Sequence, residues 1–99
     1  MYRNWFDLQT MPETTLTIRH KVGLHARPAA LFVQAAKQFR SDIKVVHGAK
    51  EANAKSILSV LALGAEQGAV IVVRAEGEDA DQSLAALAAL VESDFGEKT

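Results

Sequence analysis

The spacing of apolar residues changes repeatedly along this chain, and that change limits the folds open to it. In residues 14–20, TTLTIRH, Leu16 and Ile18 alternate with polar residues, which is the period-two pattern of a half-buried strand. From Ala26 to about Gln38 the apolar residues recur at intervals of three and four, which predicts a helix with one apolar stripe. A strand and then a helix therefore occupy the first half of the chain.

Five further segments continue this alternation of extended and helical patterns. They are a strand over 42–47, a weaker strand at 51–53, a helix over 56–63, a strand over 69–75, and a helix whose apolar stripe runs from Ala80 to Phe95. The fourth of these, AVIVVRA, is dense in β-branched residues, which predicts a central position in a sheet. The order β-α-β-β-α-β-α indicates an α+β fold, with an antiparallel sheet and helices packed on one of its faces.

The composition places further limits on this chain. Its 99 residues, 48% of them hydrophobic, suffice for one domain with a modest core. There is no cysteine, which excludes disulfides, thiolate metal sites and thiol nucleophiles and is compatible with a reducing compartment. No apolar run reaches the ~18 residues that a membrane-spanning helix needs. We expect a cytoplasmic monomer with no membrane insertion.

Residues 1–13 stand apart from the periodic segments. They hold three of the six aromatic residues, yet they precede the first predicted strand. We predict a flexible N-terminal extension here, with Met11 as an alternative start, and a single domain over residues 14–95. An ordered arm that covers apolar surface or mediates self-association is the alternative.

The net charge of −1 hides an uneven distribution of charged residues. Residues 1–55 hold nine basic and four acidic residues, whereas residues 56–99 hold two basic and eight acidic ones. The basic half predicts an acidic partner or an anionic group, and a well-solvated bipolar surface is the alternative. The basic residues are dispersed and no aromatic residues alternate with them, so we expect no nucleic-acid partner.

The stretch GLHARPAAL, residues 23–31, puts a histidine at the start of the first predicted helix. If that helix begins at Ala26, His25 is its N-cap and Pro28 lies in the first turn, where proline is tolerated. The amides at the helix start, those of Ala26 and Arg27 among them, then point outward beside the imidazole. With the helix dipole they make an anion site, to which the dipole contributes about 0.3–1 kcal/mol.

His25 and Arg27 together supply the parts of a phosphoryl acceptor. A neutral imidazole is a nucleophile near pH 7, and a guanidinium offers a fork of donors that suits phosphate oxygens. Phosphoryl transfer needs mainly such positioning and charge stabilisation. The alternative, which these residues alone leave open, is that His25 is a helix cap or a surface residue.

The other two histidines do not add a metal site. His20, His25 and His47 show no i, i+4 pair, no HExxH motif and no neighbouring cluster of carboxylates. We interpret His20 and His47 as residues at strand ends. The chain has no legible Ser/His/Asp arrangement or glycine-rich phosphate loop either, so we predict no metal and no cofactor.

Three segments of the chain resemble the HPr family, the histidine-containing phosphocarriers of the bacterial phosphoenolpyruvate:sugar phosphotransferase system. GLHARPAALFVQAAKQF resembles the family's active-centre segment, NAKSILSVLALGAEQG its second signature, and VVRAEGEDADQSLAALAAL its final strand and helix. The three segments occur in the family's order, and the resemblance covers about residues 14–95.

The resemblance implies an open-faced β-sandwich, in which three helices cover one face of a four-stranded antiparallel sheet. It also implies that His25 accepts a phosphoryl group on Nδ1 from phosphorylated Enzyme I and passes it to the IIA domains of sugar permeases. Arg27 would balance the charge of the phosphate. The protein would be a carrier with a covalent phosphohistidine, and would turn over no substrate by itself.

The second signature adds a regulatory site and a docking surface. Ser56, a plausible N-cap, falls on the family's regulatory serine, which an HPr kinase/phosphorylase modifies in many Gram-positive bacteria; a plain cap is the alternative. The short helix after it is too apolar for one buried face. We predict that Leu58 and Leu61, beside Ile57 and with Leu31 of the first helix, form an exposed patch around His25.

Three other functions remain open at this point. The protein could serve a nitrogen-related phosphorelay, because the sequence does not show which partners take the phosphate. It could also be a non-catalytic interaction module whose switch is Ser56. A small-ligand sensor is the least favoured, since no convergent pocket can be read from the sequence.

Overall fold

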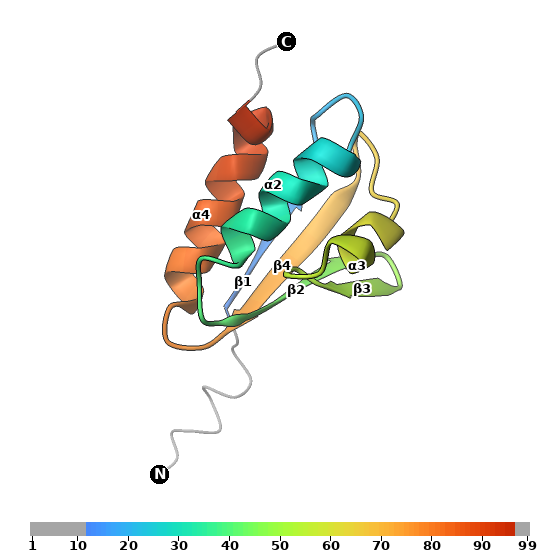
Figure 1. Ribbon diagram of the computed structural model, residues 1–99. Coiled ribbons are helices and arrows are strands. Elements are labelled where there is room, and N and C mark those ends of the chain that lie inside the picture. The colour runs from blue at the N-terminus through green and yellow to red at the C-terminus, as the bar shows by residue number, and fades with distance from the viewer. Residues whose placement is uncertain (1–11, 97–99) are drawn as a thin grey trace.

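A computed structural model describes residues 12–96, which form a four-stranded antiparallel sheet with three α-helices on one face (Figure 1). The elements are β1 (Glu13–Thr17), α2 (Ala26–Ala36), β2 (Asp42–His47), β3 (Lys50–Asn53), α3 (Ile57–Ala62), β4 (Val70–Glu76), α4 (Ala80–Glu92) and the 3₁₀ turn η1 (Asp94–Gly96). The strands lie in the order β1-β4-β2-β3. The predicted fold class and order of elements are confirmed.

β4 lies inside the sheet, as its β-branched residues predict. It pairs antiparallel with β1 on one side and with β2 on the other. In this register Leu16 lies opposite Ile71, and Val45 opposite Val73, and all four side chains are buried. Alternate residues of each strand therefore face the helices, while the opposite face of the sheet has no helix over it among the described residues (Figure 1).

The first strand ends earlier than predicted. β1 stops at Thr17, although Ile18 still exchanges backbone hydrogen bonds with Gly68 and Ala69. The chain then turns away from the sheet, because the carbonyl of His20 accepts the amide of Gly23. The interpretation of His20 as a strand-end residue is therefore wrong, since His20 lies three positions past the strand, in the loop that leads to α2.

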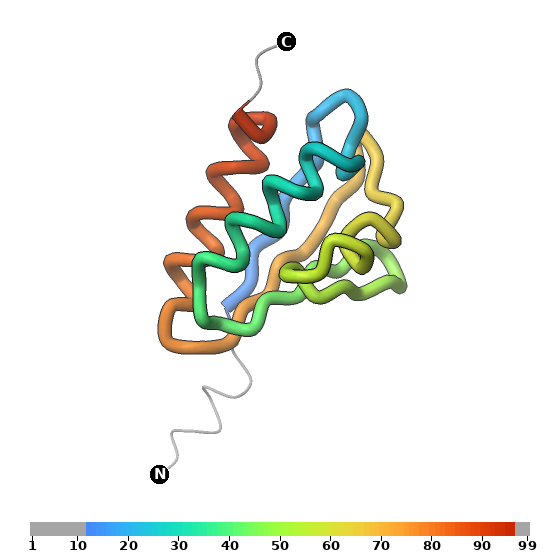
Figure 2. The backbone as a smooth tube through the Cα atoms, in the orientation of Figure 1, coloured from blue at the N-terminus to red at the C-terminus, as the bar shows by residue number. Residues whose placement is uncertain are grey.

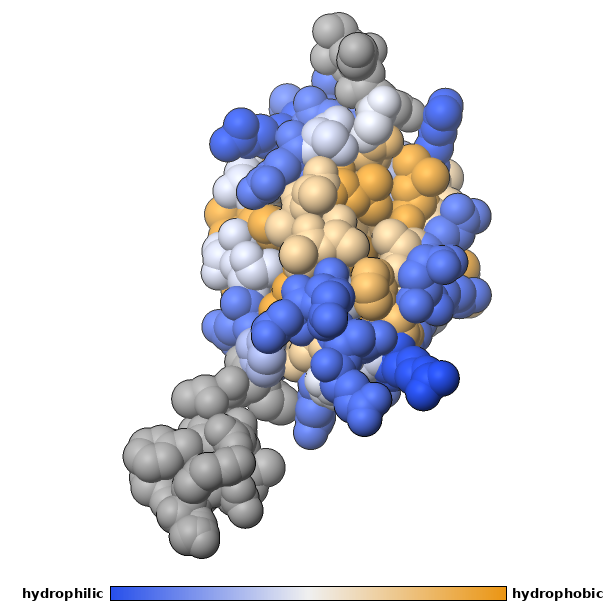
Figure 3. Space-filling model, turned by 90° about the vertical axis from the view of Figure 1, so that its left-hand side faces the viewer, coloured by the Kyte–Doolittle hydropathy of each residue, from blue (hydrophilic) through white to orange (hydrophobic). Residues whose placement is uncertain are grey.

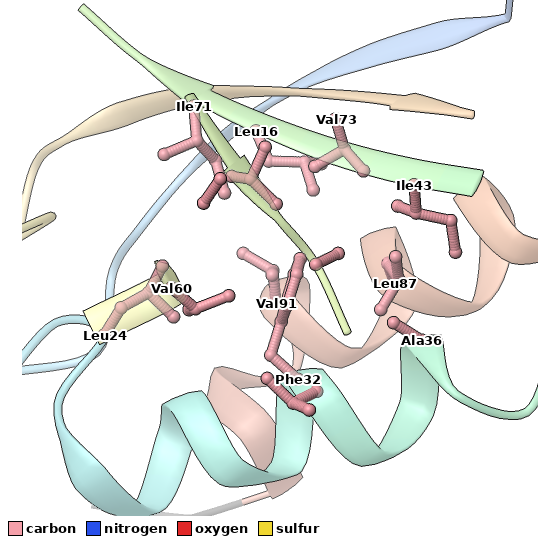
Figure 4. Packing of buried hydrophobic residues seen from close by; sticks show 14 of the residues in the cluster. Leu16, Leu24, Phe32, Ala36, Ile43, Val60, Ile71, Val73, Leu87 and Val91 are labelled. Carbon is pink, nitrogen blue, oxygen red and sulfur yellow. The ribbon is translucent and has the colours of Figure 1, made fainter. Parts of the chain in front are cut away.

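The core lies between the sheet and the helices. Figure 4 shows Phe32 and Ala36 of α2, Val60 of α3, and Leu87 and Val91 of α4 directed toward the strands. All five are buried. Phe95 also belongs to this core, as its place in the predicted stripe requires, but it lies in η1 with φ +59°, beyond the end of α4.

The outer side of α4 is apolar as well. Ala85 and Ala89 are exposed there, and Figure 3 shows apolar residues gathered on this side of the molecule. No helix among residues 12–96 is long and apolar enough to cross a membrane.

The predicted N-terminal extension lies outside the described residues, except for its last two. The carbonyl of Pro12 accepts the amide of Ala75 at 3.0 Å, and Glu13 forms an ion pair with Arg74 at 3.1 Å. β1 therefore begins one residue before the predicted domain boundary, and Pro12 already bonds to β4.

Candidate functional site

His25 occupies the N-cap of α2, with its backbone extended at φ −90° and ψ −169°. Its carbonyl accepts the amide of Ala29 at 2.7 Å, which begins the helix. The imidazole makes no capping hydrogen bond and the residue is exposed. A side-chain cap, one of the alternatives for this histidine, is therefore not what the structure shows.

The first turn of α2 favours an anion. Ala26 and Arg27 are exposed and Pro28 is buried against the core side of the helix, where a missing amide costs nothing. The first turn contains no acidic residue. The positive end of the helix dipole and the Arg27 guanidinium are therefore not offset by a carboxylate of that turn.

The position of His25 is fixed by contacts of the loop before it. Gly23 has φ +67°, and a Cβ at this residue would lie 2.6 Å from Cα of Glu66 and closer still to the carbonyl oxygen of Ala65. The amide of Leu24 donates to that same carbonyl at 2.8 Å, and the Leu24 side chain is buried. Figure 2 shows the two loops side by side. Glycine is thus required where the backbones meet.

A small cavity opens beside the imidazole. Its volume is about 270 Å³, and it is lined by Leu24, His25, Leu61, Gly64, Ala65 and Glu66. A single water needs about 10–15 Å³ by this measure, so the cavity has room for a group larger than one water molecule. Glu66 is the acidic residue among those that line it, and the sequence pattern did not indicate that it lies here.

Ser56 is the N-cap of α3, as predicted. Its Oγ accepts the amide of Ser59 at 3.4 Å, and its carbonyl accepts the amide of Val60. The serine borders an open groove of about 560 Å³ between α2 and α3. Lys37 and Lys55 line the same groove, and Nζ of Lys55 donates to the carbonyl of Phe39 at 2.7 Å.

The C-terminal end of α3 is held by the β2–β3 hairpin. Nδ1 of His47 lies 3.1 Å from the carbonyl oxygen of Leu63, and Nζ of Lys50 donates to the carbonyl of Ala62 at 3.5 Å. His47 ends β2, as predicted, but its contact with α3 could not be read from the sequence. Both ends of this short helix are therefore tied to the rest of the domain.

Most of the predicted apolar patch is exposed. Leu58 is 77% exposed, Ile57 38% and Leu61 36%. Leu58 and Ile57 line the groove that Ser56 borders, and Leu61 lines the cavity beside His25. The helix thus brings these three side chains to the surface around the predicted site.

Leu31 was expected in this patch, and that expectation is wrong. The side chain is half-buried and packs against the core, and it does not line the groove. The helix α2 packs against both α3 and α4, so side chains outside the predicted stripe can also be partly covered.

No group of three or more His, Asp and Glu side chains within residues 12–96 is arranged to hold a metal ion. The site consists of an exposed imidazole at a helix start, beside a small cavity and an apolar surface.

Comparisons with known proteins agree with this geometry. The family profile described as PTS HPr component phosphorylation site matches residues 12–93, which include His25 and Ser56. The phosphocarrier protein HPr of Xylella fastidiosa (strain Temecula1) is 45% identical over 89 residues, which cover 90% of this chain and 100% of that protein.

Two solved structures show similar folds. HPr-C-His from Thermoanaerobacter tengcongensis is 50% identical with a TM-score of 0.87, and the match covers 90% of this chain and 100% of that one. Crh, a catabolite repression protein of Bacillus subtilis, is 42% identical with a TM-score of 0.68, over 85% of this chain and 97% of that one. The crystal structure of Crh is a domain-swapped dimer.

Proposed function

The chain belongs to the HPr family, the phosphocarriers of the bacterial phosphotransferase system, and from that premise we propose that it carries a phosphoryl group on His25. The observation that supports this most is the start of α2, where an exposed imidazole makes no capping bond and the first turn contains no acid. The donor is phosphorylated Enzyme I, and the recipients are IIA domains of sugar permeases. The protein works with them in the cytoplasm.

The transfer forms one bond and breaks another. The lone pair of Nδ1 of a neutral His25 attacks phosphorus while the bond between phosphorus and the donor breaks, and the donor's leaving group takes that electron pair. The negative charge of the phosphoryl oxygens is then balanced by Arg27 and by the amides and dipole at the helix start. The next transfer runs the same step in the opposite direction, so the chain returns unchanged.

Intact-mass measurement after incubation with phosphoenolpyruvate and Enzyme I tests the proposal. The wild type should gain one acid-labile phosphoryl group, and His25→Ala should gain none. His47→Gln is the matched control, because it removes another imidazole near the site and should still accept the group. An unmodified wild type beside an HPr that the same Enzyme I phosphorylates would refute the proposal.

The exposed side chains of α3 are proposed as the docking surface for these partners. A transient interface needs a few apolar anchors, and Leu58 is the most exposed of them. Replacing it by alanine should raise the KM for Enzyme I several-fold, because truncating an interface anchor costs about 1–2 kcal/mol. Val70→Ala, which truncates an exposed side chain of β4, is the control and should leave that KM unchanged.

We propose that the chain acts as a monomer. The chain pairs its own β1 with β4 and so completes the sheet without an exchanged strand, which supports the proposal. The alternative is a domain-swapped dimer such as that of Crh. Sedimentation equilibrium should give the mass of one chain at micromolar concentration, and twice that mass would contradict the proposal.

A second candidate function is a regulatory module switched at Ser56. Ser56 borders a groove that Lys37 and Lys55 also line, and this position and the likeness to Crh favour it. A phosphate there would add about −1.5 to −2 charges to the docking surface and weaken binding to an acidic partner. In this case Ser56→Asp would change function while His25→Ala would not. In a phosphocarrier, His25→Ala has the larger effect of the two.

A further inference from the structure

We propose that His20 is a positioning residue for the phosphoryl acceptor, because it shapes the loop that presents His25 and joins that loop to the C-terminal turn of the domain. The inference rests on the proposed function of His25. His20 itself does not touch the transferred group in this account, and it acts through the backbone between Val22 and His25.

The first part of the argument is the pair of hydrogen bonds that His20 accepts. Its Nδ1 accepts the amide of Val22 at 3.3 Å, and its carbonyl accepts the amide of Gly23 at 3.0 Å. Two successive amides of the loop therefore converge on one residue. Gly23 is also the residue that meets the backbone of Ala65 and Glu66, so this turn sets how the loop approaches its neighbour.

The second part is the contact between His20 and Phe95. The two rings meet edge to face, with centroids 5.9 Å apart and an interplanar angle of 78°. Both residues are buried, with exposures of 8% and 3%. The contact joins the loop before α2 to the turn after α4, two segments far apart in the sequence.

The backbone of that C-terminal turn shows how firmly it is held. Asp94 and Phe95 have φ values of +54° and +59°, a left-handed conformation that is common enough for aspartate but rare for a bulky side chain such as that of Phe95. Phe95 is thus kept in place by its burial, and it gives the ring of His20 a fixed surface to pack against.

A histidine meets both requirements at once, and this makes the proposal specific. Nδ1 can accept the Val22 amide only while it carries no proton, and the ring supplies the contact with Phe95. Asparagine can place its Oδ1 near the position of Nδ1 and so keep the acceptor without the ring. Phenylalanine keeps a ring but offers no acceptor. The two substitutions therefore separate the two contacts.

The test compares His20→Asn and His20→Phe in phosphoryl transfer from Enzyme I and in the NMR signals of the His25 ring and the Val22 amide. His20→Phe should slow transfer about three- to tenfold, the effect of one lost hydrogen bond on the barrier, and shift both signals. His20→Asn should restore the Val22 amide signal and recover most of the rate. Val45→Ala, a core substitution in β2, is the control for lost stability and should change neither readout beyond its loss of folded protein.

Wild-type rates and His25 signals in a folded His20→Phe variant would overturn the inference. An equal loss of transfer rate in His20→Asn and His20→Phe would overturn the role assigned to the Nδ1 acceptor. If the wild type accepts no phosphoryl group, the proposed function of His25 fails, while the NMR signals of Val22 and His25 still decide whether His20 positions the loop.

Discussion

The two long helices of this domain begin in opposite ways. The first turn of α2 contains no acidic residue, and its N-cap His25 keeps an exposed side chain that caps nothing. The first turn of α4 contains Asp81, and its N-cap is Asp79. Both helix starts carry the same dipole, yet only α4 has acidic residues at its N-cap and in its first turn.

The carboxylate of Asp79 serves a contact between distant segments. It does not cap its own helix, but accepts the amides of Arg40 and Ser41 at 2.9 and 3.0 Å and the hydroxyl of Ser41. The hydroxyl bond, followed by the Arg40 amide, holds the pKa of Asp79 below its ordinary value of 3.8. The comparison teaches that a helix start far from the site is neutralised for stability, whereas the one at the site is left able to bind an anion.

Gly23→Ala should have the largest effect on stability, because it disturbs the loop that leads into α2. The new Cβ would clash with the backbone of Ala65 and Glu66 at a residue with positive φ. We expect a loss of about 2–5 kcal/mol in the free energy of unfolding, from left-handed strain and overpacking together. Urea denaturation checks this. Gly64→Ala is the control, since it has a similar φ but open space around its Cβ, so it should lose only the strain part.

Asp79→Asn tests the other helix start. Because the pKa of Asp79 is lowered in the folded state, its ionised form stabilises the fold above the ordinary value of 3.8, and this contribution is lost as the pH falls through the lower folded value. The variant should therefore be less stable than the wild type at neutral pH, and the two should converge in acid. Thermal unfolding between pH 2 and pH 7 measures the difference. A difference that does not change with pH would contradict the account.

Ala26→Asp would give α2 the acidic first turn that α4 has. The helix should gain about 0.3–1 kcal/mol of stability, because a carboxylate near the N-terminus is attracted to the positive end of the dipole. The rate of phosphoryl acceptance should nevertheless fall several-fold, since the same charge repels the phosphoryl group. Moving the acid to Lys37→Asp, just past the C-terminal end of α2, is the control and should not give that gain in stability.

Glu66→Gln should have the smallest effect. Glu66 lines the cavity beside His25, but the residue is exposed, so solvent screens its charge. Removing the charge should raise the half-life of the phosphorylated form by no more than about threefold, since an exposed pair contributes under about 1 kcal/mol. A shorter half-life would show that Glu66 supports the phosphoryl group instead of opposing it.

Much of the fold could be predicted because it depends on local patterns. The alternation around Leu16 and Ile18, the dense β-branched run of β4 and the stripe of α4 each reflect burial on one face, which period alone reports. The exposed Leu58 and Leu61 were also predictable, since a helix as short as α3 cannot bury so many apolar residues.

The features that were missed depend on residues far apart in the sequence. The bonds between Asp79 and Ser41 join positions 38 residues apart. The contact between His20 and Phe95 joins a loop near the start of the domain to the turn at its end. Leu31 was misplaced because its partial burial against the core depends on how the elements pack, which the stripe of one helix does not report. The His25 site could be predicted because its parts, an imidazole, an arginine and a helix start, are adjacent in the sequence.

The central claim is that the open helix start of α2 holds the phosphoryl group on His25. Long-range ¹H–¹⁵N correlation spectra of the three imidazoles, recorded before and after phosphorylation by Enzyme I and phosphoenolpyruvate, test it most directly. The account predicts that Nδ1 of His25 alone acquires the shift and the phosphorus coupling of a phosphorylated nitrogen, while the rings of His20 and His47 keep their own signals. A phosphorylated chain in which His25 is unchanged and another residue carries the phosphorus would contradict it.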